Sequence, residues 1–143
     1  MPNGSREWTL GRSVFRFEPP DVLWAGLRGE TTLDVATRII ALYQELGRVQ
    51  PFFLVCDMSE AVHLGSESRR YISENIRGEW LLGLIYVRAR LVHKGLARGI
   101  MLVSQLMGNA DERALTKLHF VPTLGHAQEL IARLRETHTL GIA

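Results

Sequence analysis

The sequence predicts a single α/β domain built on one single-layer, mixed, mainly parallel sheet with crossover helices, in the order β-β-α-β-α-β-α-β-α. Apolar runs that suit buried strands alternate along the chain with segments whose apolar residues recur at helical spacing. The length of 143 residues is that of one domain. A content of 46% hydrophobic and 22% charged residues is typical of a globular protein.

The chain is expected to open with a hairpin. Residues 1–11 are interpreted as a flexible lead-in, and residues 14–17 predict a short edge strand. Pro19 and Pro20 predict a turn, because proline fixes φ and has no N–H to donate to a ladder. Residues 22–27 then predict a second strand beside the first.

A first helix is predicted from Leu33 to about Leu46. Thr32 is placed to cap its start, and Gly47 is a typical stop. At about 100° per residue, the apolar residues gather on one side of this helix and the polar residues on the other. The apolar side consists of Val35, Ala36, Ile39, Ile40, Leu42, Tyr43 and Leu46.

Two further apolar runs predict buried strands. Residues 51–58 form a run that is continuously apolar up to Asp57, and residues 82–87 form another. A second helix is expected to start near Ser66, between these two strands. A third and longer helix is expected over residues 88–107.

The chain is expected to close with a strand and a helix. Residues 117–121 predict a strand that Pro122 stops, and Thr123 is placed to cap the last helix. The apolar residues of this helix recur at helical spacing and are Ala127, Leu130, Ile131 and Leu134. We therefore expect one domain over residues 12–136, followed by a C-terminal tail at residues 137–143.

Charge and cysteine content narrow the classes of partner and setting. A formal net charge of +2, without a block of like charges, argues against nucleic acid as the main partner. The single cysteine, Cys56, lies in an apolar run and is expected to be a buried free thiol, which fits a cytoplasmic setting. We expect no membrane span, because five basic or imidazole side chains interrupt the apolar-rich residues 80–107. These are Arg88, Arg90, His93, Lys94 and Arg98.

No motif points to metal, phosphate or nucleophile chemistry. The five histidines are His63, His93, His119, His126 and His138, and no pair has the helical spacing of a metal site. Residues 95–99 have a glycine at each end but lie inside a helical pattern, unlike a phosphate-binding loop. The Gly-x-Ser-x-Gly nucleophile elbow is absent from the sequence. We therefore expect no metal, no cofactor and no enzymatic activity, and leave open a site assembled from distant residues.

The segment that follows the central strand is the first candidate for a binding surface. It is expected to be a loop over residues 57–65 that leads into a helix at Ser66. In parallel α/β sheets, ligands and partners bind at the carboxyl ends of the strands. A helix N-terminus also favours an anion, so a phosphate on Ser66 is electrostatically compatible with this position. The alternative is that Ser66 is simply the helix N-cap, and local physics alone favours this alternative.

The expected long helix is the second candidate, because it has two apolar faces. One face is the core arc of Ala89, Val92, Leu96, Ile100, Val103 and Met107. The nearly opposite face carries Leu91, Leu102 and Leu106 next to Gly95 and Gly99. Such a face is covered by a partner, by a second copy or by an apolar ligand, or its leucines are simply exposed. Burial by a partner is favoured over burial by lipid.

The order of elements and two local motifs resemble the STAS domain, the fold of bacterial anti-sigma factor antagonists. Members of this family end the central strand with an Asp-Leu-Ser or Asp-Phe-Ser step, which residues 57–59 (Asp-Met-Ser) match. About seven residues later they carry a hydrophobic-Asp-Ser-Ser-Gly-Leu motif, whose first serine is phosphorylated by a kinase. Residues 64–69 lie at this motif, with Ser66 at the phosphoacceptor position. They depart from it at Gly65, at Glu67 and at the pair Ser68-Arg69.

The resemblance implies a regulatory protein-interaction module whose partner is another protein, a kinase-type regulator. Its interaction rim would consist of Asp57, Ser59, His63, Arg69 and Arg70, with Ser66 as the phosphoacceptor among them. Relatives within this broad fold include small domains similar to CRAL-TRIO lipid-transfer modules. The alternative function is therefore a carrier or sensor of an apolar ligand. A homodimer through the outer leucine face of the long helix is compatible with the first of these functions, the interaction module.

Overall fold

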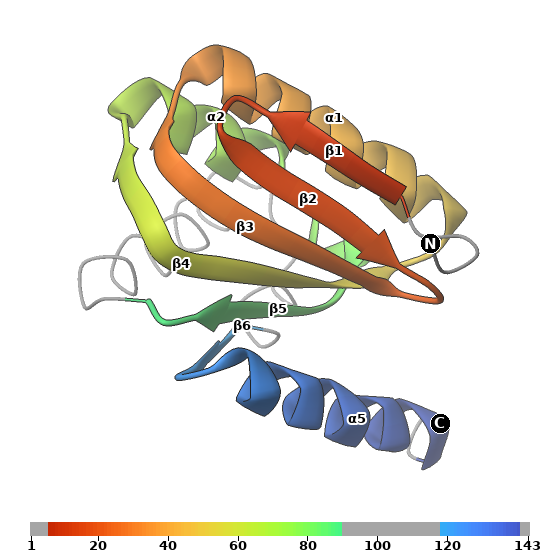
Figure 1. The fold of residues 1–143 in the computed structure, drawn as a ribbon. Coiled ribbons are helices and arrows are strands. Elements are labelled where there is room, and N and C mark those ends of the chain that lie inside the picture. Colours follow the sequence, from red (N-terminus) through yellow and green to blue (C-terminus); the bar gives the residue numbers. More distant parts are fainter. Residues whose placement is uncertain (1–5, 90–117, 141–143) are drawn as a thin grey trace.

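The computed structural model describes residues 6–89 and 118–140 (Figure 1). In these residues, six strands form one sheet in the order β1-β2-β3-β4-β5-β6. The strands are β1 (Arg6–Leu10), β2 (Ser13–Glu18), β3 (Val22–Thr31), β4 (Phe52–Leu64), β5 (Leu81–Val87) and β6 (Leu118–Val121). The first three strands pair antiparallel, and β3 to β6 pair parallel. The described chain therefore has the expected mixed, mainly parallel sheet.

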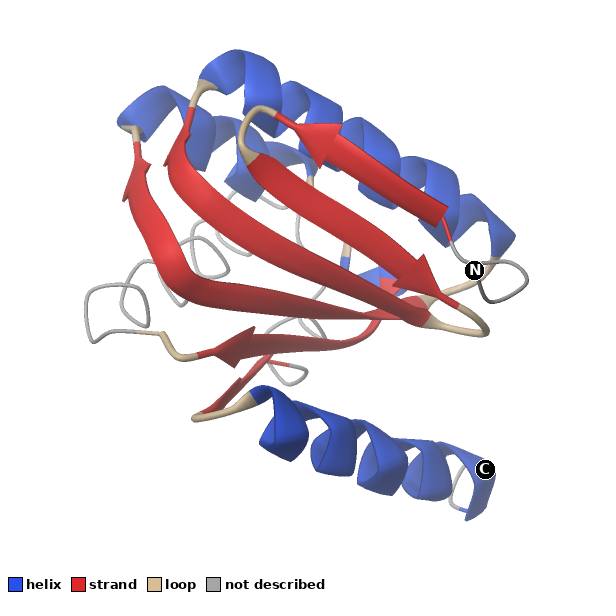
Figure 2. Ribbon diagram, viewed as in Figure 1, coloured by secondary structure: helices blue, strands red, loops and turns tan. Residues whose placement is uncertain are grey.

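Helices cover both faces of this sheet (Figure 2). On one face lie α1 (Leu33–Val49) and α2 (Ser66–Asn75), which with the sheet enclose a first core. On the other face lies α5 (Leu124–Leu140), whose Ala127 and Ile131 enter a second core. A short 3-10 helix, η1 (Gly78–Trp80), precedes β5. No helix in the described residues has the length and apolar character needed to cross a membrane.

Strand β4 supplies side chains to both cores. Leu54 and Cys56 point into the first core, whereas Phe53 and Val55 point into the second. All four are at most 3% exposed. Because successive side chains of a strand point to opposite faces, a strand buried on both faces needs an uninterrupted apolar run. The burial of β4 on both faces explains why residues 51–58 are almost continuously apolar.

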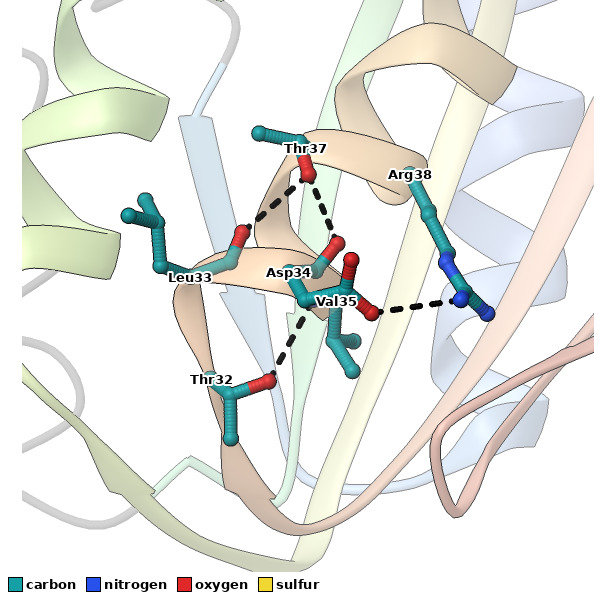
Figure 3. Close-up of polar contacts among 6 residues, drawn as sticks. All are labelled: Thr32, Leu33, Asp34, Val35, Thr37 and Arg38. Atoms are coloured by element: carbon teal, nitrogen blue, oxygen red, sulfur yellow. Dashed lines mark hydrogen bonds and ion pairs between the residues drawn. The ribbon is translucent and has the colours of Figure 1, made fainter.

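The hairpin of β2 and β3 and the start of α1 confirm the sequence-based expectations, except that β2 is not the edge strand, because β1 pairs with its outer side. The backbone N–H of Val35 donates to Oγ1 of Thr32 at 3.3 Å (Figure 3). Thr32 is therefore the N-cap of α1, as predicted. Figure 3 also shows the ion pair of Asp34 with Arg38 one turn along, at 3.2 Å.

Two predictions about the first fifty residues are wrong. The lead-in expected at residues 1–11 contains β1, which pairs with β2 and packs Trp8 and Leu10 against the first core. Helix α1 does not stop at Gly47 but continues to Val49, with Gln50 as its C-cap. Gly47 is required because the helix closely approaches another side chain, Trp80, and not because the helix ends there.

The loop expected at residues 57–65 is wrong as well, because β4 continues through it to Leu64. This half of β4 pairs with the last residues of β3, with Arg28 beside Glu60 and Gly29 beside Ala61. The register shifts twice along it, so that β4 carries more residues than β3 over the same length. A polar stretch that resembles a loop in sequence is thus held as a strand by its neighbour.

The C-terminal elements agree with expectation at their start and differ at their end. Oγ1 of Thr123 accepts the backbone N–H of His126 at 3.1 Å, which caps α5. Helix α5 then runs to Leu140, past the boundary expected at residue 136. The expected long helix falls almost wholly on residues 90–117, which lie outside the described residues.

Candidate functional site

The interaction rim expected from the sequence lies where β3 and β4 extend beyond β5. Asp57 lies beside Val87, the last residue of β5, and His63 lies beside Glu30 of β3. Figure 1 shows both long strands continuing past β5 to the starts of α1 and α2. The structure therefore places the rim residues at the carboxyl edge of the parallel strands, where α/β sheets bind ligands and partners, but spreads them along the second half of β4 and the first turn of α2.

Asp57 and Ser59 form a local backbone contact at the start of this extension. One carboxylate oxygen of Asp57 accepts the backbone N–H of Ser59 at 3.0 Å. The contact lies at the first register shift, where the four residues from Asp57 to Glu60 lie opposite the three from Gly26 to Arg28. Ser59 itself is exposed. Asp57 thus stabilises the bulge, and Ser59 faces solvent there.

Ser66 is the first residue of α2, and it is exposed. The N-cap of this helix is Gly65, which has no side chain to accept a hydrogen bond. The alternative that Ser66 is simply the N-cap is therefore wrong. Within the described residues, the Ser66 hydroxyl makes no hydrogen bond. Its neighbour Glu67 places a carboxylate in the first turn, where the helix dipole favours a negative charge.

The two arginines of the rim differ in their surroundings. The Nε atom of Arg70 donates to Glu74 at 2.9 Å, one turn along α2, and this hydrogen bond raises the pKa of the Arg70 guanidinium. Arg69 is also exposed, and its backbone N–H donates to the carbonyl of Gly65 at 2.9 Å. Its guanidinium forms no ion pair with any described residue. Arg69 is therefore the rim arginine that is available to an anionic group.

The structure adds residues that sequence reasoning missed. Across the extension, Nε of Arg28 lies 3.1 Å from a carboxylate oxygen of Glu60. Val62 of the same half-strand is 73% exposed, Leu33 at the start of α1 is 42% exposed, and Leu124 at the start of α5 is 37% exposed. These three belong to the carboxyl edge of the parallel strands. The sequence gives no signal for them, because they come from three elements that only the sheet aligns.

The second candidate surface is not described. Its residues, Leu91, Gly95, Gly99, Leu102 and Leu106, lie outside the described residues. Among residues 6–89 and 118–140, no three or more His, Cys, Asp and Glu side chains gather in an arrangement that could hold a metal ion. Cys56 is 3% exposed, and burial raises the pKa of its thiol to about 12. The thiol is therefore protonated, and thus a poor nucleophile, at neutral pH.

No protein-family model matches the chain, and no curated protein matches it in sequence. The STAS resemblance therefore rests on the order of the elements and on the residues around Asp57 and Ser66.

Proposed function

We propose that the chain is a non-enzymatic, STAS-like regulatory module that binds another protein through the interaction rim. The observation that supports this most directly is the position of Ser66. It is exposed on the first turn of a helix that begins directly after the carboxyl end of a central parallel strand. The carboxyl ends of the strands are where α/β sheets usually bind ligands and partners.

The composition of the edge fits a protein partner. Exposed apolar side chains, Leu33 and Val62, accompany the charged pair of Arg28 and Glu60 and the available guanidinium of Arg69. Protein interfaces combine apolar anchors, which contribute most of the binding energy, with polar groups that fix orientation. Nucleic acid is not proposed as the partner, because this edge carries acidic as well as basic groups.

A phosphate on Ser66 would change this surface strongly. It would add a charge of about −1.5 to −2 at neutral pH, next to the carboxylate of Glu67. The helix dipole and the arginine three residues along, Arg69, favour that charge, whereas Glu67 opposes it. We therefore propose a kinase-type regulator as the partner and phosphorylation of Ser66 as the switch that weakens binding.

The test compares the modification state with partner capture. Phosphopeptide analysis of the protein purified from its native host should find phosphate on Ser66. Immobilised wild-type protein and Ser66→Ala should capture the same partner from the host extract, and Ser66→Asp should capture at least tenfold less. Gln128→Glu adds one negative charge to the exposed face of α5 and should capture as much partner as the wild type. An unmodified Ser66 together with unchanged capture by Ser66→Asp would remove the switch.

A further inference from the structure

Two buried serine hydroxyls hold the last residues of β3. Ser68, in the first turn of α2, is 3% exposed, and its Oγ donates to the carbonyl of Thr31 at 2.9 Å. Ser13, at the start of β2, is 2% exposed, and its Oγ accepts the backbone N–H of Arg28 at 3.0 Å. A buried hydroxyl without a hydrogen bond is unfavourable, because the free-energy cost of removing it from water is then not offset. These bonds therefore fix the end of β3 more firmly than exposed contacts of the same length would.

The bond from Ser68 acts at the first turn of α2, where no side chain caps the helix. The N-cap Gly65 provides no side-chain acceptor, whereas Thr32 provides one for α1. The first backbone bond of α2 runs from the N–H of Arg69 to the carbonyl of Gly65. Ser68 lies beside Arg69 and two residues after Ser66, so its attachment to β3 restrains the turn that carries both.

We propose that Ser68 is a positioning residue of the interaction rim. Its hydroxyl fixes the first turn of α2 on the end of β3 and so determines where Ser66 and Arg69 are presented. Because Thr31 directly precedes the N-cap Thr32, the same bond links the start of α2 to the start of α1. The STAS motif has glycine at the position of Ser68, so the hydroxyl is a feature of this chain. The role in presentation rests on the proposed function, but the restraint itself does not.

Ser68→Ala and Ser73→Ala form a matched pair for testing the restraint. Ser73 is 2% exposed in the same helix, but its Oγ donates to the carbonyl of Arg70, within α2. Amide hydrogen exchange of the free protein, followed residue by residue, should show that Ser68→Ala speeds exchange at Arg69 and Ala36 about fivefold. Ser73→Ala should leave the Ala36 amide, which bonds to the Thr32 carbonyl, unchanged. Exchange in the central strand β4 should be unaffected by either change.

Equal effects of the two variants at Ala36, or no effect of Ser68→Ala at either amide, would overturn the proposal. If Ser68→Ala does not fold, Ser68→Cys fills the site with a slightly larger sulfur and weakens the hydrogen bond, and it should give the same pattern with a smaller increase. In the native host, phosphate occupancy at Ser66 should fall in Ser68→Ala relative to Ser73→Ala. The exchange result uses the free protein and so does not depend on a partner. If the wild-type chain from the native host carries no phosphate on Ser66, the proposed phosphorylation switch is wrong. The amide exchange rates at Arg69 and Ala36 still test the positioning role of Ser68.

Discussion

At the scale of single residues, Gly47 lies near the end of α1, where Trp80 packs against the helix. A Cβ atom at this position would lie 2.7 Å from two ring atoms of Trp80 and 2.9 Å from its Cβ. The space that glycine leaves is therefore filled by the indole. Alanine favours a helix by about 1 kcal/mol over glycine. The clash with a partly buried aromatic side chain opposes that gain and is larger.

We predict that Gly47→Ala destabilises the protein by about 1 to 3 kcal/mol, as overpacking does. The urea unfolding midpoint, followed by circular dichroism, measures this. Gly125→Ala in α5 is the matched control, because its Cβ would lie 3.7 Å from Oγ1 of Thr123, an ordinary contact. The control should be neutral or slightly stabilising. A stabilised Gly47→Ala would show that Trp80 moves freely away from α1.

The helix caps show which local features the sequence predicts. The sequence predicts Thr32 and Thr123 as N-caps, and each accepts the backbone N–H of the residue three positions on, a contact made within the local chain. Ser66 was also a possible cap, but β4 continues to Leu64 and the chain turns at Gly65. The pairing of β4 with β3 therefore determines where α2 begins. This long-range contact is why Ser66 is the first residue of the helix and not its N-cap.

At the scale of elements, the carboxyl half of β4 is the part that the sequence predicts least well. Its residues Ser59 and Glu60 are polar, and polar residues after an apolar run are typical of a loop. They form a strand because β3 extends equally far and pairs with Glu60 and with residues on either side of it, with two register shifts. The sequence still predicts that these residues follow the carboxyl end of the apolar run, because that position depends only on the order and direction of the parallel strands.

Helix α5 is attached to the sheet by a contact between distant parts of the sequence. The guanidinium of Arg135 pairs with the carboxylate of Asp21, in the turn between β2 and β3, and lies 5.9 Å from the ring centre of Phe53. The Asp21 side chain is only 15% exposed, so its charge is partly shielded from water. No periodicity of the sequence indicates this pair, because its members lie 114 positions apart.

We predict that Arg135→Ala lowers the free energy of unfolding by about 1 to 2 kcal/mol, because the ion pair and the contact with Phe53 are both lost. Arg133→Ala is the control, since Arg133 is exposed on the same helix and its guanidinium pairs with no described residue. That change should cost less than about 0.5 kcal/mol. Chemical denaturation of the two variants under identical salt measures the difference. Equal values would mean that the Asp21 contact contributes nothing.

At the scale of the whole molecule, the two cores are joined through the sheet. Leu84 of β5 packs in the first core and Ile85 in the second, as alternate residues of β4 also do. The alternation of strands and helices predicted this architecture, because crossover helices must cover a parallel sheet. Strand β1 was missed because Trp8 and Leu10 are its only large apolar residues. These two side chains pack against the first core only because β1 pairs with β2, which the sequence of β1 alone does not indicate.

The first core also contains ionisable groups that must stay neutral, and they determine how the protein responds to alkali. Burial raises the pKa of Cys56 to about 12, and burial also raises the pKa values of Tyr43 and Tyr86. In the unfolded chain the thiol ionises near pH 8.5 and the phenols near pH 10. Below pH 8.5 both states hold these protons. As pH rises further, the unfolded chain releases them first, so stability must fall.

We therefore predict that the free energy of unfolding of the wild type, and with it the urea midpoint, decreases from about pH 8.5 upward. The thiol alone should lower the free energy of unfolding by up to about 1.4 kcal/mol per pH unit. Cys56→Ala should be less stable at pH 7, because a buried side chain is shortened, yet its midpoint should change little between pH 8.5 and 10. Near and above pH 10 both proteins should lose stability together, because the tyrosines of the unfolded chain are half ionised at about pH 10. Circular dichroism at a series of pH values follows both. Parallel curves for the two proteins between pH 8.5 and 10 would show that the Cys56 thiol ionises equally readily in the folded protein.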